Sequence, residues 1–261
     1  MELKPLERGW IADYVKLHNL EMVNRNDREV IPKNTFYVRY VKRVLDIVLA
    51  FGACIVTLPI NLILAIFTFL DVGKPIFFSQ KRPGKNNKEF TIVKFRNMRN
   101  AVDENGFWLP IEKRVTKFGS FVRRTSMDEL LNFYSILKGD MSFIGPRPLA
   151  MLYLERYSKR HMMRHAVRPG LECPNIKRKG YSIGWNEKLE NDIWYVENVS
   201  FLVDCKMLIL LFKMVFDLKT RRQHAESGVG DFLGYDENGI AFGAREVPEK
   251  YLKLLQSSKE K

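Results

Sequence analysis

The fold of this chain is decided by residues 47–70, which read IVLAFGACIVTLPINLILAIFTFL and contain no charged side chain. As a helix, a stretch of this length reaches across a bilayer core of about 30 Å. It starts too far into the chain, and lacks a small-x-small cleavage site, to be a cleavable signal peptide. A buried core helix is the alternative, but such helices seldom stay uncharged for so long. The stretch therefore predicts a helix embedded in a membrane.

Basic residues flank this segment on both sides. Arg39, Lys42 and Arg43 lie upstream, and eight Lys or Arg residues lie between positions 74 and 99. Basic residues near membrane ends favour the cytoplasmic side, so both ends are expected on that side. Pro59, near the midpoint, removes a backbone donor and bends a helix. We therefore expect residues 39–72 to form a re-entrant helix-break-helix kinked at Pro59; a straight span is the alternative.

The charge and the cysteines restrict the partners and the compartment. The chain of 261 residues has a formal net charge of +13, which suits nucleic acid, anionic membrane lipids or phosphorylated substrates. No recognition helix, zinc knuckle or ribonucleoprotein motif is present, so we expect no nucleic-acid partner. Cys54, Cys173 and Cys205 lack metal or redox spacing, and we expect the catalytic part to face a reducing compartment.

The predicted fold class is α+β, mostly helical, and monotopic in the membrane. Around the re-entrant helix we expect an N-terminal extension (1–38), a catalytic domain on the cytosolic face (73–218) and an irregular C-terminal extension (219–261). Within the catalytic domain, strand-like residues on either side of a Pro83-Gly84 turn predict a small β-hairpin over 75–99.

The remaining local patterns predict a loop, a helix and two interfacial segments. We expect a loop over 101–117 and a helix over 126–138 that ends at Gly139. Residues 151–165 mix apolar and basic side chains, as does an amphipathic helix on an anionic membrane surface. Residues 205–216 are apolar except for two lysines and are too short to span a bilayer. Packing within the domain is the alternative for both segments.

The adjacent acids Asp128 and Glu129 are the strongest candidates for chemistry. Ser126 and Glu129 also have the spacing of a capping box, so the acids could serve only to cap the helix expected there. A capping Glu129 would not be free for proton transfer. Either Thr125 is the cap instead, or Glu129 acts only after substrate arrives.

The residues around this acid pair favour a chemical role. Arg123 and Arg124 immediately precede the expected helix, and a helix N-terminus presents unpaired amides. Together these groups would bind an anion and hold Asp128 ionised. A carboxylate beside a phosphate site can act as a nucleophile toward phosphorus.

Two further patterns present cations suited to phosphate. Pro146 and Pro148 stiffen the backbone around Arg147, so its guanidinium is well placed for forked contact with a phosphate. A simple turn with a solvated arginine is the alternative. On the second expected strand, alternation puts Lys94 and Arg96 on one face, where they would neutralise a pyrophosphate or contact lipid headgroups.

Five motifs follow one another along the chain. They are Lys42-Arg-Val-Leu-Asp46, Phe77-Phe-Ser-Gln-Lys-Arg-Pro-Gly84, Val93-Lys-Phe-Arg-Asn-Met98, Arg124-Thr-Ser-Met-Asp-Glu-Leu130 and Leu137-Lys-Gly-Asp-Met-Ser-Phe-Ile-Gly-Pro-Arg-Pro148. This series resembles the bacterial sugar transferase family, the monotopic phosphoglycosyl transferases that begin the assembly of lipid-linked glycans. The resemblance covers about residues 39–218.

The resemblance implies a ping-pong reaction on the cytoplasmic face of the bacterial inner membrane. Asp128 would attack the β-phosphorus of a UDP-sugar and release UMP, and polyprenyl (undecaprenyl) phosphate would then take the sugar phosphate from the enzyme. Glu129 would assist proton transfer, and Mg²⁺ beside Asp128 would offset pyrophosphate charge. Lys94, Arg123 and Arg147 fall at phosphate-binding positions of the family.

The chain departs from the family pattern at one place. After Arg168-Pro-Gly-Leu171 the family commonly continues Thr-Gly-Trp, with a glutamine two residues later, whereas this chain reads Glu172-Cys-Pro-Asn-Ile-Lys177. Ile176 stands where that glutamine would be. We therefore expect this region to contact substrate differently. A changed sugar specificity is one interpretation, and a catalytically weakened membrane-anchored scaffold is the other.

Overall fold

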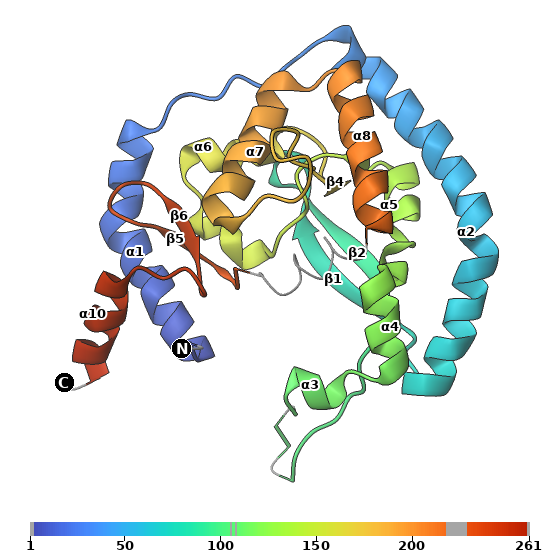
Figure 1. Ribbon diagram of the computed structural model, residues 1–261, viewed down its shortest axis with the longest axis horizontal. Helices are drawn as coiled ribbons and strands as arrows, with labels where there is room; N and C mark the ends of the chain where they lie inside the picture. Colours follow the sequence, from blue (N-terminus) through green and yellow to red (C-terminus); the bar gives the residue numbers. More distant parts are fainter. Residues whose placement is uncertain (1–2, 105, 108, 218–228, 260–261) are drawn as a thin grey trace.

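The apolar stretch forms most of one long helix, α2 (Lys42–Val72), in the computed structural model. The structure describes residues 3–104, 106–107, 109–217 and 229–259. α2 continues a π-helical turn, Tyr37–Val41, and is long and apolar enough to cross a membrane. It is helical through Pro59, so the expected break is absent; Figure 1 shows instead a curved helix along one side of the molecule. Proline and the hydroxyl of Thr57, which donates to the Ala53 carbonyl, both favour bending without interruption.

Polar contacts fasten both ends of α2 to the rest of the molecule. At its start, the Arg43 guanidinium donates to the Ile136 and Leu137 carbonyls, and the Asp46 carboxylate accepts from the Ser142 hydroxyl at 3.0 Å. At its end, the Arg96 guanidinium donates to the Val72 and Gly73 carbonyls. Helix C-termini present carbonyls with few intrahelical partners, and Arg43 and Arg96 donate to such carbonyls at two helix ends.

The described residues confirm a mostly helical α+β fold. Antiparallel strands β1 (Phe77–Pro83) and β2 (Glu89–Phe95) form the predicted hairpin. Strands β3 (Ser142–Ile144) and β4 (Gly170–Glu172) pair in parallel, and β5 (Phe232–Tyr235) pairs with β6 (Ala241–Gly243). The other described α-helices are α1 (Pro5–Asn26), α3 (Ile111–Arg114), α4 (Lys117–Thr125), α5 (Asn132–Lys138), α6 (Lys159–Met162), α7 (Gly184–Asn198), α8 (Phe201–Phe216) and α10 (Glu249–Lys259).

The helix expected over 126–138 is divided, and the loop expected over 101–117 is partly helical. Thr116 begins α4, because its hydroxyl accepts from the Gly119 amide at 2.8 Å. Ser126 then ends α4 in a left-handed conformation (φ 55°) instead of starting a helix. A 3₁₀ turn, Met127–Glu129, separates it from α5, which ends at Gly139 as predicted.

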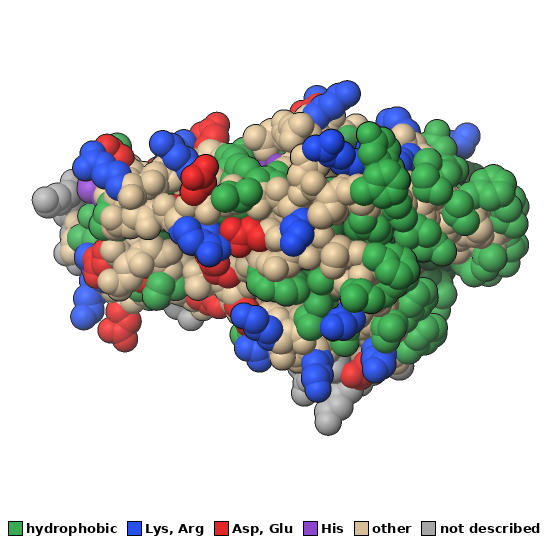
Figure 2. Space-filling view, turned by 90° about the horizontal axis from the view of Figure 1, so that it is seen from above, with side chains coloured by type: hydrophobic (Ala, Val, Ile, Leu, Met, Phe, Trp, Pro, Cys, Tyr) green, Lys and Arg blue, Asp and Glu red, His purple; other side chains and the backbone are tan. Residues whose placement is uncertain are grey.

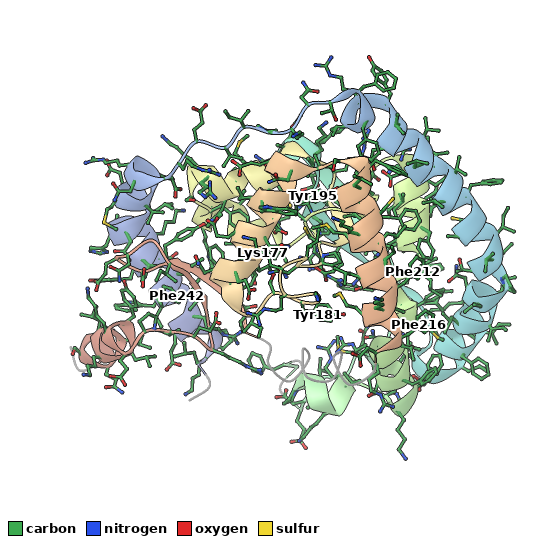
Figure 3. The ribbon with its side chains drawn as sticks, turned by 45° about the horizontal axis from the view of Figure 1, so that its top comes forward. Lys177, Tyr181, Tyr195, Phe212, Phe216 and Phe242 are labelled. Carbon is green, nitrogen blue, oxygen red and sulfur yellow. The ribbon has the colours of Figure 1, made fainter. Side chains whose placement is uncertain are left out.

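Of the two segments expected to lie at the membrane interface, 151–165 is packed within the protein, whereas the helix over 205–216 exposes apolar side chains. Residues 151–165 fold into short 3₁₀ and α turns, and Arg164 is only 1% exposed, so the packing alternative is correct there. α8 buries Met207 and Met214, whereas Phe212 and Phe216 project from its last turns and are exposed (Figure 3). Figure 2 shows exposed hydrophobic side chains gathered over the side of the molecule where α2 lies.

The expectation of an irregular C-terminal extension is wrong for the described residues 229–259. Strands β5 and β6 and helix α10 pack on α1, so the two ends of the chain lie side by side (Figure 1). A cluster of buried aromatic side chains joins this terminal unit to the catalytic region. It comprises Tyr153, Tyr157, Trp185, Phe232 and Tyr235. Such short, glycine-containing strands depend on contacts distant in sequence, which local patterns do not reveal.

Candidate active site

A pocket opens where the β1–β2 hairpin meets the acid pair and the Arg147 loop. Segments far apart in sequence contribute to it: β2 packs against the 3₁₀ turn and α5, and Phe143 and Leu171 of the β3–β4 pair pack in the same cluster as residues of β2. Its lining residues are Phe78, Gln80, Arg82, Ile92, Lys94, Glu129, Asn132, Met141, Arg147, Pro148, Gly170 and Leu171. Cationic side chains outnumber the single carboxylate, which favours an anionic ligand.

Glu129 is bound to two of the expected phosphate-binding residues. Its Oε1 accepts from Lys94 Nζ at 2.6 Å and also from Arg147 Nη2. Burial alone would raise the pKa of Glu129, but the charges of Arg147 and Lys94 outweigh burial and lower it. The capping box is therefore absent, because Ser126 ends the preceding helix and Glu129 is a paired carboxylate in the pocket. Thr125 is not the cap either, since it is the last residue of α4.

Asp128 lies next to this pocket, on the same 3₁₀ turn, and is 9% exposed. Its Oδ2 accepts a hydrogen bond of 3.3 Å from Asn97 Nδ2. Burial raises the pKa of this carboxyl, and the opposing charge of Lys94 does not fully offset that effect. Arg123 lowers this pKa, as expected, but desolvation is the largest influence.

Arg123 reaches Asp128 through an intermediate residue. Its Nε donates to Asn97 Oδ1 at 3.0 Å, and the same amide donates to Asp128. Asn97 is 9% exposed, so its amide is held by these two partners. Sequence reasoning missed Asn97 as a site residue, although it lies inside the motif Val93-Lys-Phe-Arg-Asn-Met98.

Arg147 is held on several sides, so the alternative of a solvated arginine in a simple turn is wrong. Besides binding Glu129, its Nη1 donates to the Leu171 carbonyl at 3.2 Å and lies 3.6 Å from Glu172 Oε2. Glu172 is the first residue of the segment that departs from the family pattern. The departure therefore begins in contact with the pocket.

A buried arginine supports the Arg147 loop from behind. Arg164 Nη2 donates to the Arg147 carbonyl at 2.9 Å and to Asp192 Oδ2 at 2.6 Å. Arg164 is one of the basic residues that made 151–165 look like an interfacial helix, so the sequence carried no signal of this role. Its partner Asp192 comes from α7, which only the tertiary structure brings here.

The other predicted residues fall into two groups. Lys94 and Arg147 join Glu129 in the pocket, with Asp128 and Arg123 beside it. Arg96 lies elsewhere: it is not among the pocket-lining residues and binds carbonyls at the end of α2. The strand alternation that grouped it with Lys94 ends at Phe95, the last residue of β2.

Comparison with known proteins agrees with these motifs. Residues 37–218 match the family described as bacterial sugar transferase. The chain is 41% identical over 174 residues to the "Uncharacterized sugar transferase EpsL" of Bacillus subtilis, covering 67% of this chain and 86% of that protein.

Two named transferases are longer than this chain. A "UDP-N-acetylgalactosamine-undecaprenyl-phosphate N-acetylgalactosaminephosphotransferase" of Aeromonas hydrophila is 34% identical over 189 residues, covering 69% of this chain and 44% of the relative. A "UDP-glucose:undecaprenyl-phosphate glucose-1-phosphate transferase" of Xanthomonas campestris is 30% identical over 223 residues, covering 78% of this chain and 44% of the relative. This chain thus spans less than half of their lengths. Because the family match covers more than half of the chain and agrees with its motifs, this protein belongs to the bacterial sugar transferase family.

Proposed function

We propose that this protein transfers a sugar phosphate from a UDP-sugar to undecaprenyl phosphate through a covalent intermediate on Asp128. The named relatives act on substrates of these two classes. The observation that carries the proposal is the buried Asp128 carboxylate beside a pocket in which Lys94 and Arg147 share Glu129. This arrangement puts a nucleophile next to cations that can hold the phosphates of a nucleotide sugar.

In the first half-reaction, an Asp128 carboxylate oxygen bonds to the β-phosphorus of the donor. The bond from that phosphorus to the bridging oxygen breaks, and its electron pair leaves with UMP. Limited exposure of Asp128 removes water that would otherwise solvate and weaken the nucleophile. The Asn97 amide orients the carboxylate while its other end binds Arg123.

In the second half-reaction, a phosphate oxygen of the acceptor attacks the same phosphorus. The bond from phosphorus to Asp128 breaks, which restores the carboxylate. Glu129 is ionised because its pKa is lowered, with burial opposed by the charges of Arg147 and Lys94. It therefore accepts, rather than donates, any proton that the acceptor still carries.

Magnesium fits this site in combination with the donor. Among the described residues, no group of three or more His, Cys, Asp or Glu side chains could hold a metal ion without help. The Glu129 oxygen that Lys94 and Arg147 share is already occupied, so Asp128 is the carboxylate we propose as its ligand. Magnesium commonly combines one or two carboxylates with substrate phosphates. When bound, it would neutralise charge on the pyrophosphate.

We further propose that α2, which is curved but unbroken at Pro59, is re-entrant, and that the catalytic region lies on the cytoplasmic face of the inner membrane. The attachment of both ends of α2 to the same body supports this placement, since Arg43 and Arg96 each bind helix-end carbonyls there. The exposed apolar surface of the helix and the net charge of +13 suit a membrane with anionic lipids.

The test is a half-reaction without acceptor. Membrane fractions containing the full chain are given a panel of radiolabelled UDP-sugars, and UMP release and label on the protein are measured. Asp128→Asn should abolish both signals, whereas Asp13→Asn, on the exposed face of α1, should leave them unchanged. Full activity of Asp128→Asn would refute the nucleophile assignment. Absence of UMP release with every donor would instead favour the weakened scaffold.

A further inference from the structure

Arg82 is a cation of the pocket that forms no ion pair with a carboxylate of the described residues. It lines the same space as Lys94, Glu129 and Arg147. Lys94 and Arg147 both bind Glu129, but the hydrogen bond of the Arg82 guanidinium within the described residues goes to the neutral Gln80, at 2.6 Å from Nη2 to Oε1. Burial, followed by repulsion from Arg147, lowers the pKa of Arg82. The pocket thus holds a partly buried positive charge whose hydrogen-bond partner among the described residues is neutral.

Strand geometry explains why Arg82 faces this space. Side chains two apart on a strand share one face, and Phe78, Gln80 and Arg82 all line the pocket from β1. Arg82 pairs across the hairpin with Phe90, whereas Lys94 pairs with Phe78. Arg82 is therefore four residues along the hairpin from Lys94, or about 13 Å. This spacing is between backbone positions. At their side chains, Lys94 binds Glu129 whereas Arg82 binds Gln80, so the two cations have different partners in the pocket.

An anion beside Arg82 would remove both penalties at once. It would compensate the desolvated charge and screen the repulsion from Arg147. A guanidinium has five N–H donors in a planar fork, and a single acceptor on Gln80 leaves donors for a forked contact with phosphate. Gln80 is suited to orient this fork, because its amide oxygen holds one edge of the guanidinium.

We infer that Arg82, oriented by Gln80, forms a second phosphate-binding subsite, separate from the group held near Lys94 and Asp128. This inference rests on the proposed function, which requires more than one phosphate in the pocket. The ligand is a phosphate oxyanion from one of two sources. It is either the nucleotide phosphate that leaves with UMP or the terminal phosphate of the polyprenyl acceptor.

The two half-reactions distinguish these sources. Full-length protein in membranes is assayed first for UMP release and label on the protein without acceptor, and then for transfer from the labelled protein to undecaprenyl phosphate. Arg82→Gln should slow one of these steps by about 10- to 100-fold, the effect of losing a hydrogen-bonded contact between charges. A slower first step assigns the subsite to the nucleotide phosphate. A slower second step assigns it to the phosphate of the acceptor.

Arg82→Lys keeps the charge but not the fork, and should fall between wild type and Arg82→Gln. The matched control is Lys81→Gln. Lys81 is the next residue on the opposite face of β1, where its ammonium pairs with Glu89 at 2.7 Å on the surface. This control loses the same charge outside the pocket and should keep both steps at the wild-type rate.

Thermal unfolding separates binding from a structural role. Because Arg82 is repelled by Arg147, Arg82→Gln should melt at or above the wild-type temperature while one step is slowed. Unchanged rates in both steps would overturn the inference, as would equal slowing of both with a lowered melting temperature. UMP release by the wild-type protein is measured before any variant is compared. If the wild-type protein releases no UMP, the proposed function is refuted instead.

Discussion

Arg164 donates to the backbone carbonyl of Arg147 over 2.9 Å, and so connects the interior of the protein to the pocket. The side chain that reaches the substrate pocket and the side chain that holds its backbone are both arginines, but their surroundings differ. Arg147 is 35% exposed at its side chain, whereas that of Arg164 is 1% exposed and paired with Asp192, itself 2% exposed. Repulsion between the two arginines is limited because each has its own carboxylate.

Breaking this buried pair should be costly. Asp192→Asn leaves the Arg164 charge without compensation, and we expect a loss of about 3–5 kcal/mol in the free energy of unfolding. A double variant, Arg164→Met with Asp192→Leu, should be more stable than either single variant because no charge is left buried. Thermal and denaturant unfolding of detergent-solubilised protein measures this. Equal destabilisation by the single and double variants would contradict it.

Glu129→Gln should separate binding from turnover. Lys94 and Arg147 would lose their shared carboxylate and become free to hold donor phosphates, so KM for the UDP-sugar should stay constant or fall. Loss of the proton acceptor should lower kcat by about 100-fold. Steady-state kinetics report both values. The control is Glu89→Gln, on the hairpin surface, and a raised KM with unchanged kcat for Glu129→Gln would argue against this role.

The pH dependence of UMP release should depend on Asn97. Burial raises the pKa of Asp128, and its nucleophilic form is the ionised one, so the rate should fall as pH decreases through that raised pKa. Asn97→Ala removes a hydrogen bond to the carboxylate, which should raise the pKa further and shift the acidic limb to higher pH. Asn100→Ala, at an exposed position, is the control. A shift of the Asn97→Ala profile to lower pH would refute this explanation.

Stability should depend on pH through His165. Burial, reinforced by the charge of Arg164, lowers the pKa of this imidazole from 6.5 to about 3. The unfolded chain therefore binds a proton below pH 6.5 that the folded chain does not, and stability is lost as pH falls from 6.5 toward 3. The contribution of this residue should approach about 1.4 kcal/mol per pH unit.

His165→Gln removes this titration and should flatten the dependence of unfolding free energy on pH between 6.5 and 4. His18→Gln changes an exposed histidine on α1 and should leave the slope as it is in the wild type. Denaturant unfolding at several pH values provides the comparison. An unaltered slope in His165→Gln would show that other groups govern the acid response.

The re-entrant placement of α2 predicts that both of its flanks react from one side of the membrane. In a background without Cys54, Cys173 and Cys205, single cysteines at Tyr40 and Lys74 should both be labelled by an impermeant reagent applied to the cytoplasmic side. The reagent applied from the other side should label neither. Labelling of one position from each side would establish a straight span.

The long apolar helix and the hairpin could be predicted because their signals are local. An uncharged run of this length predicts a long helix without knowledge of the fold, and strand-like residues around a Pro83-Gly84 turn predict a hairpin. The acid pair, Lys94 and Arg147 were also predicted, since their motifs are continuous segments of chain. The helix boundary at Ser126 was not, because serine is a typical N-cap residue, whereas left-handed helix ends usually carry Gly or Asn.

Only the tertiary structure decided how those residues are used. Glu129 is a paired carboxylate because Lys94 and Arg147, distant in sequence, converge on it. The pKa of Asp128 is raised because burial depends on everything packed around it, and Arg164 serves the pocket because α7 brings Asp192 to it. Composition determined that this protein has an apolar helix and a surplus of cations. Which cations face carboxylates, carbonyls or an open pocket depends on contacts between segments, which no local pattern records.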